Sequence, residues 1–292
     1  MTPDAVQVQT FVAVVDHGSF DAAARVLNVT PSAVSQRIRG LENALGQTLV
    51  ERALPARATA AGERLLRYAR QVQVLHDDLE GDLDAASVGI RVVSISVNAD
   101  SLATWFLPAF DRVTREHAIT LELHREDEQS KAAMLRAGRV MAAVTADRRP
   151  VVGCRSTRLG VMRYRAVASP AYVDDWLSGR PHLAQGAPIV TFDRSDDLQH
   201  NYFRTSTGNA LGAPRHYIPS TTEHRTAVLL GLGWGMIPEI FCSSLLAEGA
   251  LVDLTPGRTL DVPLHWQRWK VASTLLDTVT ELVAGAARSA LA

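Results

Sequence analysis

The segment 31–45 combines an apolar stripe with a polar face at helical spacing. Its apolar residues lie four, three and four positions apart: Val34, Ile38, Leu41 and Leu45. Its polar residues repeat a similar spacing on the opposite face: Ser32, Ser35, Gln36 and Arg39. At about 100° per residue, each set occupies one side of an α-helix. The pattern predicts a helix that buries one side and presents hydrogen-bonding side chains on the other.

A second short helix is predicted directly before this one. Thr30 is a suitable N-cap, and Pro31 suits the first helical position, where a missing N–H costs nothing. The segment 19–27 starts at Ser19 and has alanines at 22–24, which let another helix approach closely. Asn28 then tolerates the left-handed conformation that such a turn often demands. The two segments predict a helix-turn-helix whose second helix can enter a DNA major groove.

The alternative interpretation is an ordinary helical hairpin with a solvated polar face. The first turn of the second helix argues against it, because its hydroxyl and amide groups can reach bases or phosphates beside free backbone N–H groups. Arg37 and Arg39 follow in this helix. Arg52 and Arg57 follow in a segment with proline and alanine that has the character of a wing. These basic positions favour DNA binding.

Roughly the first seventy residues resemble the winged helix-turn-helix of LysR-type transcriptional regulators. The resemblance is carried by VDHGSFDAAARVLNVTPSAVSQRIRGLENALGQTLVER (15–52) and TAAGERLL (59–66), which keep turn, recognition helix, wing and following helix in order. Val50 departs from the family, which usually has Phe at this packing position. The predicted DNA-binding residues are Ser19, Thr30, Pro31, Ser32, Ser35, Gln36, Arg37, Arg39, Arg52 and Arg57.

A long helix is predicted over 62–87, where the chain has no proline or turn cluster. Apolar residues form two seams of a heptad pattern: Leu65, Val72, Leu79 and Ala86, with Tyr68 and Leu75. Three heptads favour a helix that pairs with a second copy, although a simple amphipathic surface helix has a similar pattern. Pairing allows two half-sites of DNA to be engaged. In LysR-type proteins this segment is the dimerising linker, so the resemblance implies a homodimer or homotetramer.

Strands and helices alternate beyond residue 89, which predicts a mostly parallel sheet covered by helices. The predicted strands are 90–97, 119–124, 140–145, 164–169, 188–192, 215–220 and 263–272, and the predicted helices are 100–115, 129–137, 222–232 and 273–291. The family's effector domain resembles a two-lobed periplasmic binding protein, which implies one lobe from 89–163 and 267–292 and another from 164–266. The predicted fold class is therefore multidomain α+β: a winged helix-turn-helix (1–61), a linker helix (62–88) and a two-lobed α/β effector domain (89–292).

Composition limits the remaining possibilities. The 292 residues carry a net charge of −1 and include 47% hydrophobic residues, as in an ordinary soluble protein. Cys154 and Cys242 are too few for a disulfide framework, and neither belongs to a CxxC pair. No apolar run reaches membrane-spanning length, and residues 1–15 lack the basic and apolar parts of a signal peptide. We therefore expect a cytoplasmic protein without membrane contact.

Candidate ligand-binding residues lie where predicted strands lead into helices. Ligands of open α/β sheets bind outside the carboxyl ends of strands, and helix N-termini attract anions such as an α-carboxylate. Two such strand ends carry clusters of polar residues: Asn98, Asp100 and Ser101 in the first, and Ser220, Thr221 and Glu223 in the second. Thr145, at the end of the strand 140–145, is a weaker candidate. The alternative is plain N-capping, which requires the same residue types.

Acidic residues suggest the charge of the ligand. Glu126 and Asp127 follow the second strand, and Asp193 follows the strand 188–192. If these loops converge, carboxylates lie beside the anion-binding helix ends, which suits a basic amino acid. Exposed loops are also commonly acidic, and this is our interpretation of Asp196 and Asp197.

A second resemblance agrees with this ligand. NADSLATWFLP (98–108) and GLGWGMIP (231–238) are similar to stretches of the LysR-type subfamily that senses lysine and arginine and controls amino-acid export, the ArgP/LysG-like regulators. The resemblance implies lysine or arginine as effector, without a further cofactor. It also implies the promoter of a basic amino-acid exporter gene as the double-stranded DNA operator, with RNA polymerase as partner during activation.

Other chemistries have little support in the sequence. The glycines at 231, 233 and 235 follow a predicted helix rather than a strand, so they predict a turn and not a nucleotide loop. The nine histidines show no metal-ligand spacing, and no nucleophile motif is present. We therefore predict a non-enzymatic regulator with no metal. Two alternatives remain open, an amino-acid enzyme fused to a DNA-binding head and an architectural DNA-binding protein with a vestigial sensor.

Overall fold

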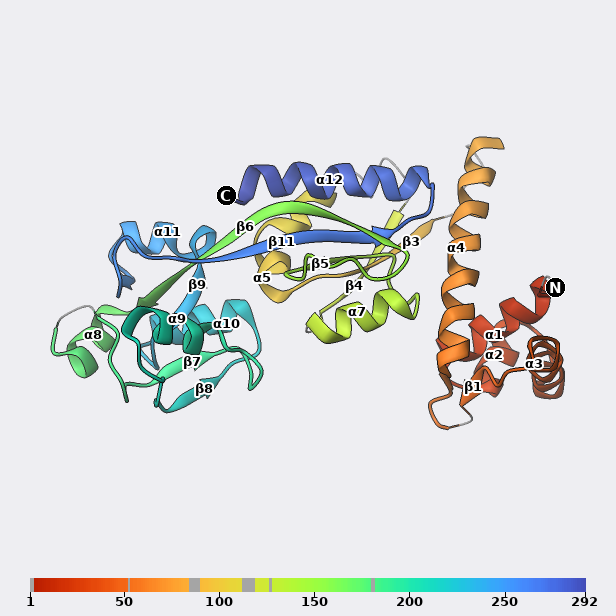
Figure 1. Cartoon of the computed structure of the whole chain (residues 1–292), viewed down its shortest axis with the longest axis horizontal. Coiled ribbons are helices and arrows are strands. Elements are labelled where there is room, and N and C mark those ends of the chain that lie inside the picture. The colour runs from red at the N-terminus through yellow and green to blue at the C-terminus, as the bar shows by residue number, and fades with distance from the viewer. Residues whose placement is uncertain (1–2, 52, 84–89, 112–118, 126–127, 180–181) are drawn as a thin grey trace.

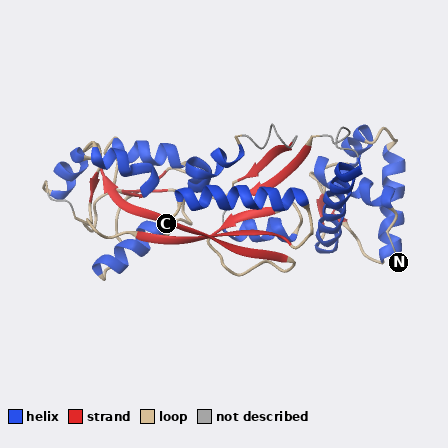
Figure 2. Cartoon of the chain, turned by 90° about the horizontal axis from the view of Figure 1, so that it is seen from above, coloured by secondary structure: helices blue, strands red, loops and turns tan. Residues whose placement is uncertain are grey.

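The protein is elongated, with a helical head at one end and two α/β lobes following it (Figures 1 and 2). The structure is a computed structural model that describes residues 3–51, 53–83, 90–111, 119–125, 128–179 and 182–292. We call residues 3–58 the head. We call the lobe beside it lobe 1; it contains β3 (Arg91–Ser96), β4 (Ile119–His124), β5 (Ala142–Thr145) and α12 (Thr274–Ala290). We call the far lobe lobe 2; it contains β7 (Ile189–Thr191) and β8 (Arg215–Tyr217). None of the helices in these ranges combines the length and the hydropathy that a membrane span requires.

The head contains the predicted helix-turn-helix. Its elements are α1 (Ala5–His17), α2 (Phe20–Val26), α3 (Pro31–Leu45), β1 (Val50–Glu51) and β2 (Arg57–Ala58). Asn28 has a φ of 52°, which is the left-handed conformation predicted for the turn. β1 and β2 pair antiparallel to form the wing. Val50 is buried in the head core, so the departure from the family pattern affects packing.

The long helix α4 (Ala60–Leu83) connects the head to lobe 1. Four of the predicted pairing residues are exposed in the single chain: Tyr68, Val72, Leu75 and Leu79. The prediction was wrong for Leu65, which is buried in the head core because the first turns of α4 pack against the head. Ala86 lies outside the described residues.

One seven-stranded sheet extends through both lobes in the order β10-β6-β11-β5-β3-β4, with β9 paired to β6. Its strands are β3 (Arg91–Ser96), β4 (Ile119–His124), β5 (Ala142–Thr145), β6 (Cys154–Ala168), β9 (Gly235–Pro238), β10 (Val252–Asp253) and β11 (Leu260–Trp269). β3 is parallel to β4 and β5, as predicted. The other pairings of the described sheet are antiparallel, so the prediction of a mostly parallel sheet was wrong here. β6 and β11 are antiparallel, because the chain crosses to lobe 2 along one and returns along the other.

Lobe 2 has a small second sheet covered by helices. β7 (Ile189–Thr191) and β8 (Arg215–Tyr217) are parallel, and their helices are α8 (Pro170–Leu177), α9 (Leu198–Thr207), α10 (Thr221–Leu229) and α11 (Glu239–Ala247). In lobe 1, α12 (Thr274–Ala290) covers one face of the long strands, and α7 (Glu128–Arg136) lies on the other side (Figure 1). The lobe boundaries stay predictions. The register places His265 beside Thr145 of β5, two residues before the predicted return at 267.

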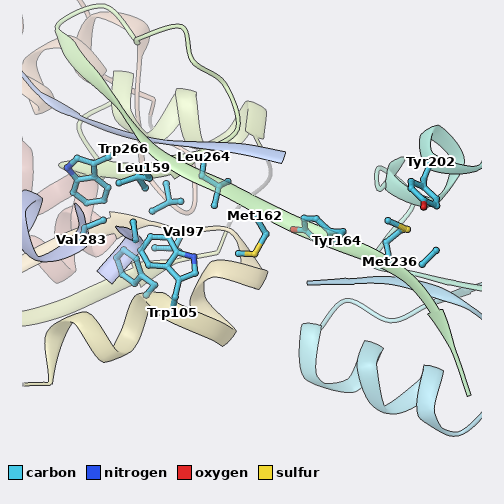
Figure 3. Packing of buried hydrophobic residues seen from close by; sticks show 14 of the residues in the cluster. Val97, Trp105, Leu159, Met162, Tyr164, Tyr202, Met236, Leu264, Trp266 and Val283 are labelled. Carbon is cyan, nitrogen blue, oxygen red and sulfur yellow. The ribbon is translucent and has the colours of Figure 1, made fainter. Parts of the chain in front are cut away.

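The apolar core follows the long strands from lobe to lobe. Trp266 and Leu159 lie in lobe 1, Met236 and Tyr202 lie in lobe 2, and Tyr164 of β6 lies between the two groups (Figure 3). The shared strands therefore link the cores of both lobes, and a residue on β6 can contact either lobe.

The predicted helix 100–115 is not a single α-helix. A short α5 (Ala99–Ser101) leads into a π-helical segment (Leu102–Phe106) and a 3₁₀ turn (Leu107–Phe110), and residues 112–118 lie outside the described ranges. Pro108 lacks a backbone N–H and cannot continue an α-helical hydrogen-bond ladder. π-Helical turns occur frequently at functional sites. The residues just before the π-helical segment are therefore candidates for a functional site.

Candidate DNA-binding surface and inter-lobe site

The helix α3 presents a polar face away from the head core. Val34, Ile38 and Leu41 are fully buried against the head. On the opposite face, Ser35 is half-buried and the other side chains are exposed: Ser32, Gln36 and Arg39. This face is therefore accessible to a partner molecule over the first two turns of the helix.

The helix start is ordered by local hydrogen bonds. The Thr30 side chain accepts from the Ala33 N–H at 3.2 Å, and its Oγ1 lies 2.9 Å from the Ser32 Oγ. Pro31 is exposed at the first position of α3. The Ser19 Oγ accepts from the Ala22 N–H at 3.1 Å and caps α2. Each cap satisfies a backbone N–H at the start of its own helix.

The basic candidates separate into two groups. Arg39 and Arg57 are exposed, on α3 and on the wing strand β2. Arg37 points back into the head, where its Nη1 donates to the Thr10 Oγ1 of α1 at 3.4 Å. Arg37 therefore does not share the polar face, because its position on the helix is close to the apolar stripe. Arg52 lies outside the described residues.

Glu42, which the sequence did not single out, ties the wing to α3. Its Oε1 accepts from the Leu49 N–H at 2.8 Å and from the Val50 N–H at 3.4 Å. Because Glu42 lies on α3 and Val50 on β1, these hydrogen bonds hold the helix and the wing together.

Asp100 connects the two lobes. Its Oδ1 accepts from the Thr221 Oγ1 of α10 in lobe 2 at 2.7 Å. Its Oδ2 accepts from the Tyr164 OH at 2.5 Å. Tyr164 lies on the crossing strand β6, between the two side-chain groups of Figure 3. Three elements from both lobes and the crossing therefore meet at one carboxylate.

Two side chains beside Asp100, Tyr164 and His224, are neutral at physiological pH. Burial and the Asp100 carboxylate raise the pKa of Tyr164 well above its usual value, so the phenol stays a donor. Burial lowers the pKa of the nearby His224 to about 4, although the Asp100 charge opposes that change. Within the described residues, no lysine or arginine forms an ion pair with Asp100. The carboxylate is thus held by hydroxyl donors without a compensating positive charge.

Several polar atoms close to Asp100 in the sequence have no hydrogen-bond partner among the residues that the structure describes. The Asn98 Oδ1 and the Ser101 Oγ are both buried and unpartnered, and so is the Trp105 Nε1. Asn98 precedes α5 but makes no side-chain capping bond, so the N-capping alternative does not describe it. A buried polar group without a partner is costly.

The remaining predicted effector residues have local partners. The Asp193 Oδ1 accepts from the Ser195 N–H at 2.7 Å and so orders its own loop. The Ser220 Oγ donates to Glu223, and the Thr145 Oγ1 accepts from the Asp147 N–H at 3.0 Å. Among the described residues, no hydrogen bond joins Asp193 or Glu223 to Asp100. The Arg125 guanidinium, just before Glu126, lies 5.8 Å from the centre of the Phe192 ring, just before Asp193, so the predicted convergence of these acidic loops stays a prediction. Glu126 and Asp127 lie outside the described residues.

Two residues near the site were missed or set aside in the sequence. Tyr164 lies within a predicted strand, where its spacing is that of an ordinary core residue. The Asp196 carboxylate accepts from the Phe192 N–H at 2.9 Å and from the Leu198 N–H at 3.0 Å. Its charge contributes to the raised pKa of Tyr164. Asp196 is therefore a carboxylate close to the site, not simply an exposed loop residue.

A helix-turn-helix head joined to a two-lobed domain with an inter-lobe polar site defines a ligand-responsive DNA-binding regulator. Residues 6–63 match the family model "Bacterial regulatory helix-turn-helix protein, lysR family", and residues 89–287 match "LysR substrate binding domain". This chain belongs to the LysR family. It is a transcriptional regulator and not an enzyme.

Several proteins are similar to this chain over nearly its whole length. The "Lysine export transcriptional regulatory protein LysG" of Corynebacterium efficiens is 40% identical over 98% of this chain and 98% of its own length. The crystal structure of ArgP from Mycobacterium tuberculosis is 42% identical, with a TM-score of 0.91 over 100% of this chain and 99% of that chain. Full-length LysG of Corynebacterium glutamicum with bound effector Arg is 36% identical, with a TM-score of 0.82 over 99% of both chains.

Proposed function

We propose that this regulator binds a basic amino acid, arginine or lysine, between its lobes and that this ligand controls its action on DNA. The observation that carries the proposal is Asp100, a carboxylate that accepts from hydroxyl donors of lobe 2 and of the crossing strand and, in the described part of the chain, pairs with no basic side chain. A positive group of the ligand would pair with this charge through a charge-assisted hydrogen bond. The arginine bound to the Corynebacterium glutamicum relative supports the same ligand class.

The unpartnered atoms suit the other end of an amino acid. The Ser101 hydroxyl can donate to an α-carboxylate, and the Asn98 Oδ1 can accept from an ammonium. Both atoms are covered in the present arrangement, so the lobes must separate for the ligand to enter. Because Asp100 contacts both lobes, a ligand that pairs with it would have different affinities for the open and closed arrangements. Such a difference is what a conformational response requires.

The DNA contacts follow from the exposed face of α3. We propose that Ser32, Ser35, Gln36 and Arg39 contact base edges in the major groove. The residues at the helix starts and in the wing would contact the backbone: Ser19, Thr30, Pro31, Arg52 and Arg57. Arg37 is left out of this set because it contacts Thr10.

The exposed apolar side of α4 supports assembly into at least a dimer. Tyr68, Val72, Leu75 and Leu79 would pair with a second copy, and two heads would then engage two half-sites. The target we propose is the promoter of a basic amino-acid exporter gene, because the Corynebacterium efficiens relative is named for lysine export. RNA polymerase would be the partner during activation, and the cytoplasm would be the compartment.

Calorimetric titration of the full chain tests the ligand. Arginine, lysine and citrulline are compared, because citrulline has nearly the shape of arginine without its charge. We expect binding of arginine or lysine and at least tenfold weaker binding of citrulline. Equal binding of citrulline would contradict the role of charge. No heat with any amino acid would favour the architectural alternative with a vestigial sensor.

A further inference from the structure

A second contact between the lobes is made by an arginine and an aromatic ring. The Arg125 guanidinium carbon lies 5.8 Å from the centre of the Phe192 ring. Arg125 directly follows β4 in lobe 1, and Phe192 directly follows β7 in lobe 2. A cation at this distance is attracted by the face of the ring. The contact therefore joins the same two lobes that the hydrogen bond between Asp100 and Thr221 joins.

In lobe 1, the two contacts start from neighbouring strand ends. β3 and β4 are paired as far as Ser96 and His124, and the Val97 N–H donates to the His124 carbonyl at 2.9 Å. The chain continues from β3 to Asp100 and from β4 to Arg125. An acidic and a basic side chain of lobe 1 thus follow adjacent strands.

Lobe 2 has a matching arrangement. β7 and β8 are paired as far as Thr191 and Tyr217, and the Ile218 N–H donates to the Thr191 carbonyl at 2.9 Å. The chain continues from β7 to Phe192 and from β8 to Thr221. Each of two adjacent strand ends in lobe 1 therefore leads to a partner after one of two adjacent strands in lobe 2.

The loop that carries Phe192 is close to the Asp100 site. The Phe192 N–H donates to the Asp196 carboxylate at 2.9 Å, which ties this residue to its own loop. The charge of Asp196 acts on the Tyr164 hydroxyl, and that hydroxyl donates to Asp100 at 2.5 Å. The aromatic ring and the inter-lobe carboxylate therefore belong to one polar region between the lobes.

The contact of Arg125 with the ring is one that a ligand can replace. Arg125 is exposed, whereas Phe192 is half-buried. Because the guanidinium is hydrated, it can leave the ring without burying an unpaired charge, which would be costly. An exposed contact between a cation and a ring is also weak. A second cation that enters between the lobes can therefore take the face of the ring from Arg125.

We propose that Arg125 is a specificity-determining residue that competes with the side-chain cation of the effector for the face of Phe192. This inference rests on the proposed function, a basic amino acid bound between the lobes. A guanidinium bonds a carboxylate through its edge and stacks on a ring through its face, whereas a lysine ammonium is a compact point charge. By occupying the ring, Arg125 weakens the binding of both amino acids and reduces the preference for arginine over lysine.

Calorimetric titration of the full chain and of Arg125→Gln tests the competition. Arginine, lysine and agmatine are the probes, because agmatine keeps the guanidinium of arginine and lacks its carboxylate. We expect Arg125→Gln to bind arginine about three- to tenfold more tightly than the parent, since one weak cation–ring contact and one repelling charge are removed. The gain should be the same for agmatine and smaller for lysine.

Three variants serve as controls. Arg194→Gln removes the same charge from an exposed arginine whose guanidinium lies 4.8 Å from the Tyr217 ring within lobe 2, and it should bind arginine within about twofold of the parent. Arg125→Lys keeps the charge and should give a smaller gain than Arg125→Gln. In a Phe192→Leu background, where the ring is absent, Arg125→Gln should change the affinity for arginine by less than about twofold. Thermal melting confirms that each variant is folded.

The outcomes separate this inference from the proposed function. If the parent binds arginine and Arg125→Gln binds it no more tightly, the competition is overturned and the proposed function stands. Weaker binding of arginine with unchanged binding of agmatine would likewise overturn it, because Arg125 would then contact the carboxylate of the ligand. An equal gain in Arg194→Gln would reduce the effect to net charge and also overturn it. Heat from Arg125→Gln alone would support the competition, whereas no heat from either protein would remove the proposed function and this inference together.

Discussion

Replacing Asp100 by asparagine separates charge from shape at the inter-lobe site. Asp100→Asn keeps the size of the side chain and leaves one oxygen to accept from Thr221 or Tyr164. It removes the negative charge and one of the two acceptors that these hydroxyls use at 2.7 and 2.5 Å. The variant therefore tests whether the ligand is bound through its positive charge.

The expected loss of affinity follows from the strength of a charge-assisted pair. Two unit charges 4 Å apart attract by about 4 kcal/mol at an effective dielectric constant of 20, but desolvation of both groups offsets part of this. Hydrogen bonds to charged groups contribute about 1.5–3 kcal/mol net. We therefore expect the dissociation constant for arginine to rise about 10- to 150-fold. The loss of one hydroxyl's acceptor should lower the unfolding free energy by only about 1 kcal/mol.

Calorimetry with arginine, lysine and citrulline measures this change, and thermal melting confirms that the variant is folded. The matched control is Asp197→Asn, which removes an exposed carboxylate from lobe 2. We expect the control to bind arginine as the parent does. An arginine affinity of Asp100→Asn within twofold of the parent, in a folded protein, would refute the assignment of Asp100 to the ligand.

Three further predictions concern the DNA, the assembly and the pH dependence of stability. Replacing Gln36 and Arg39 by Ala should weaken specific operator binding at least 30-fold, because each good base contact contributes about 1–3 kcal/mol. The same variant should bind arginine as the parent does. Footprinting measures the first effect and calorimetry the second. Leu75→Asp/Leu79→Asp places charges on the exposed stripe of α4 and should yield monomers in analytical ultracentrifugation, whereas an unchanged mass would assign assembly to another surface. The buried His224 has a pKa of about 4, so between pH 6.5 and 4 the unfolded chain binds a proton that the folded chain does not. As the pH is lowered through this range, the free energy of unfolding should decrease by up to about 3 kcal/mol. His224→Gln should flatten this part of the stability curve in denaturant titrations, and an unaltered slope would contradict the assignment.

The helix-turn-helix could be predicted from the sequence because its signals are local. Thr30, Pro31 and Asn28 cap the helices and form the turn in the structure as their residue types indicate. The apolar stripe of α3 is buried as its spacing requires. Arg37 was the exception, since its contact with Thr10 depends on where α1 packs and not on the residues of α3.

The inter-lobe site was only partly predictable. Asp100 and Thr221 were identified because strand ends at helix starts favour polar residues, and the structure joins them by a hydrogen bond. Tyr164 was missed because a tyrosine in an apolar strand has the pattern of a core residue. Asp193 was included by its position after a strand, but its loop turns the carboxylate onto its own backbone.

Elements whose stability depends on near neighbours can be predicted from the order of residues alone: the caps, the turn at Asn28 and the amphipathic faces of α3 and α4. The folded chain was needed to show which carboxylate connects the lobes and which side of α4 packs on lobe 1. Such contacts join residues far apart in the chain, as Asp100 to Thr221 or Arg70 to Asp16. Their geometry depends on how β6 and β11 cross between the lobes, and no local pattern of residues specifies that crossing.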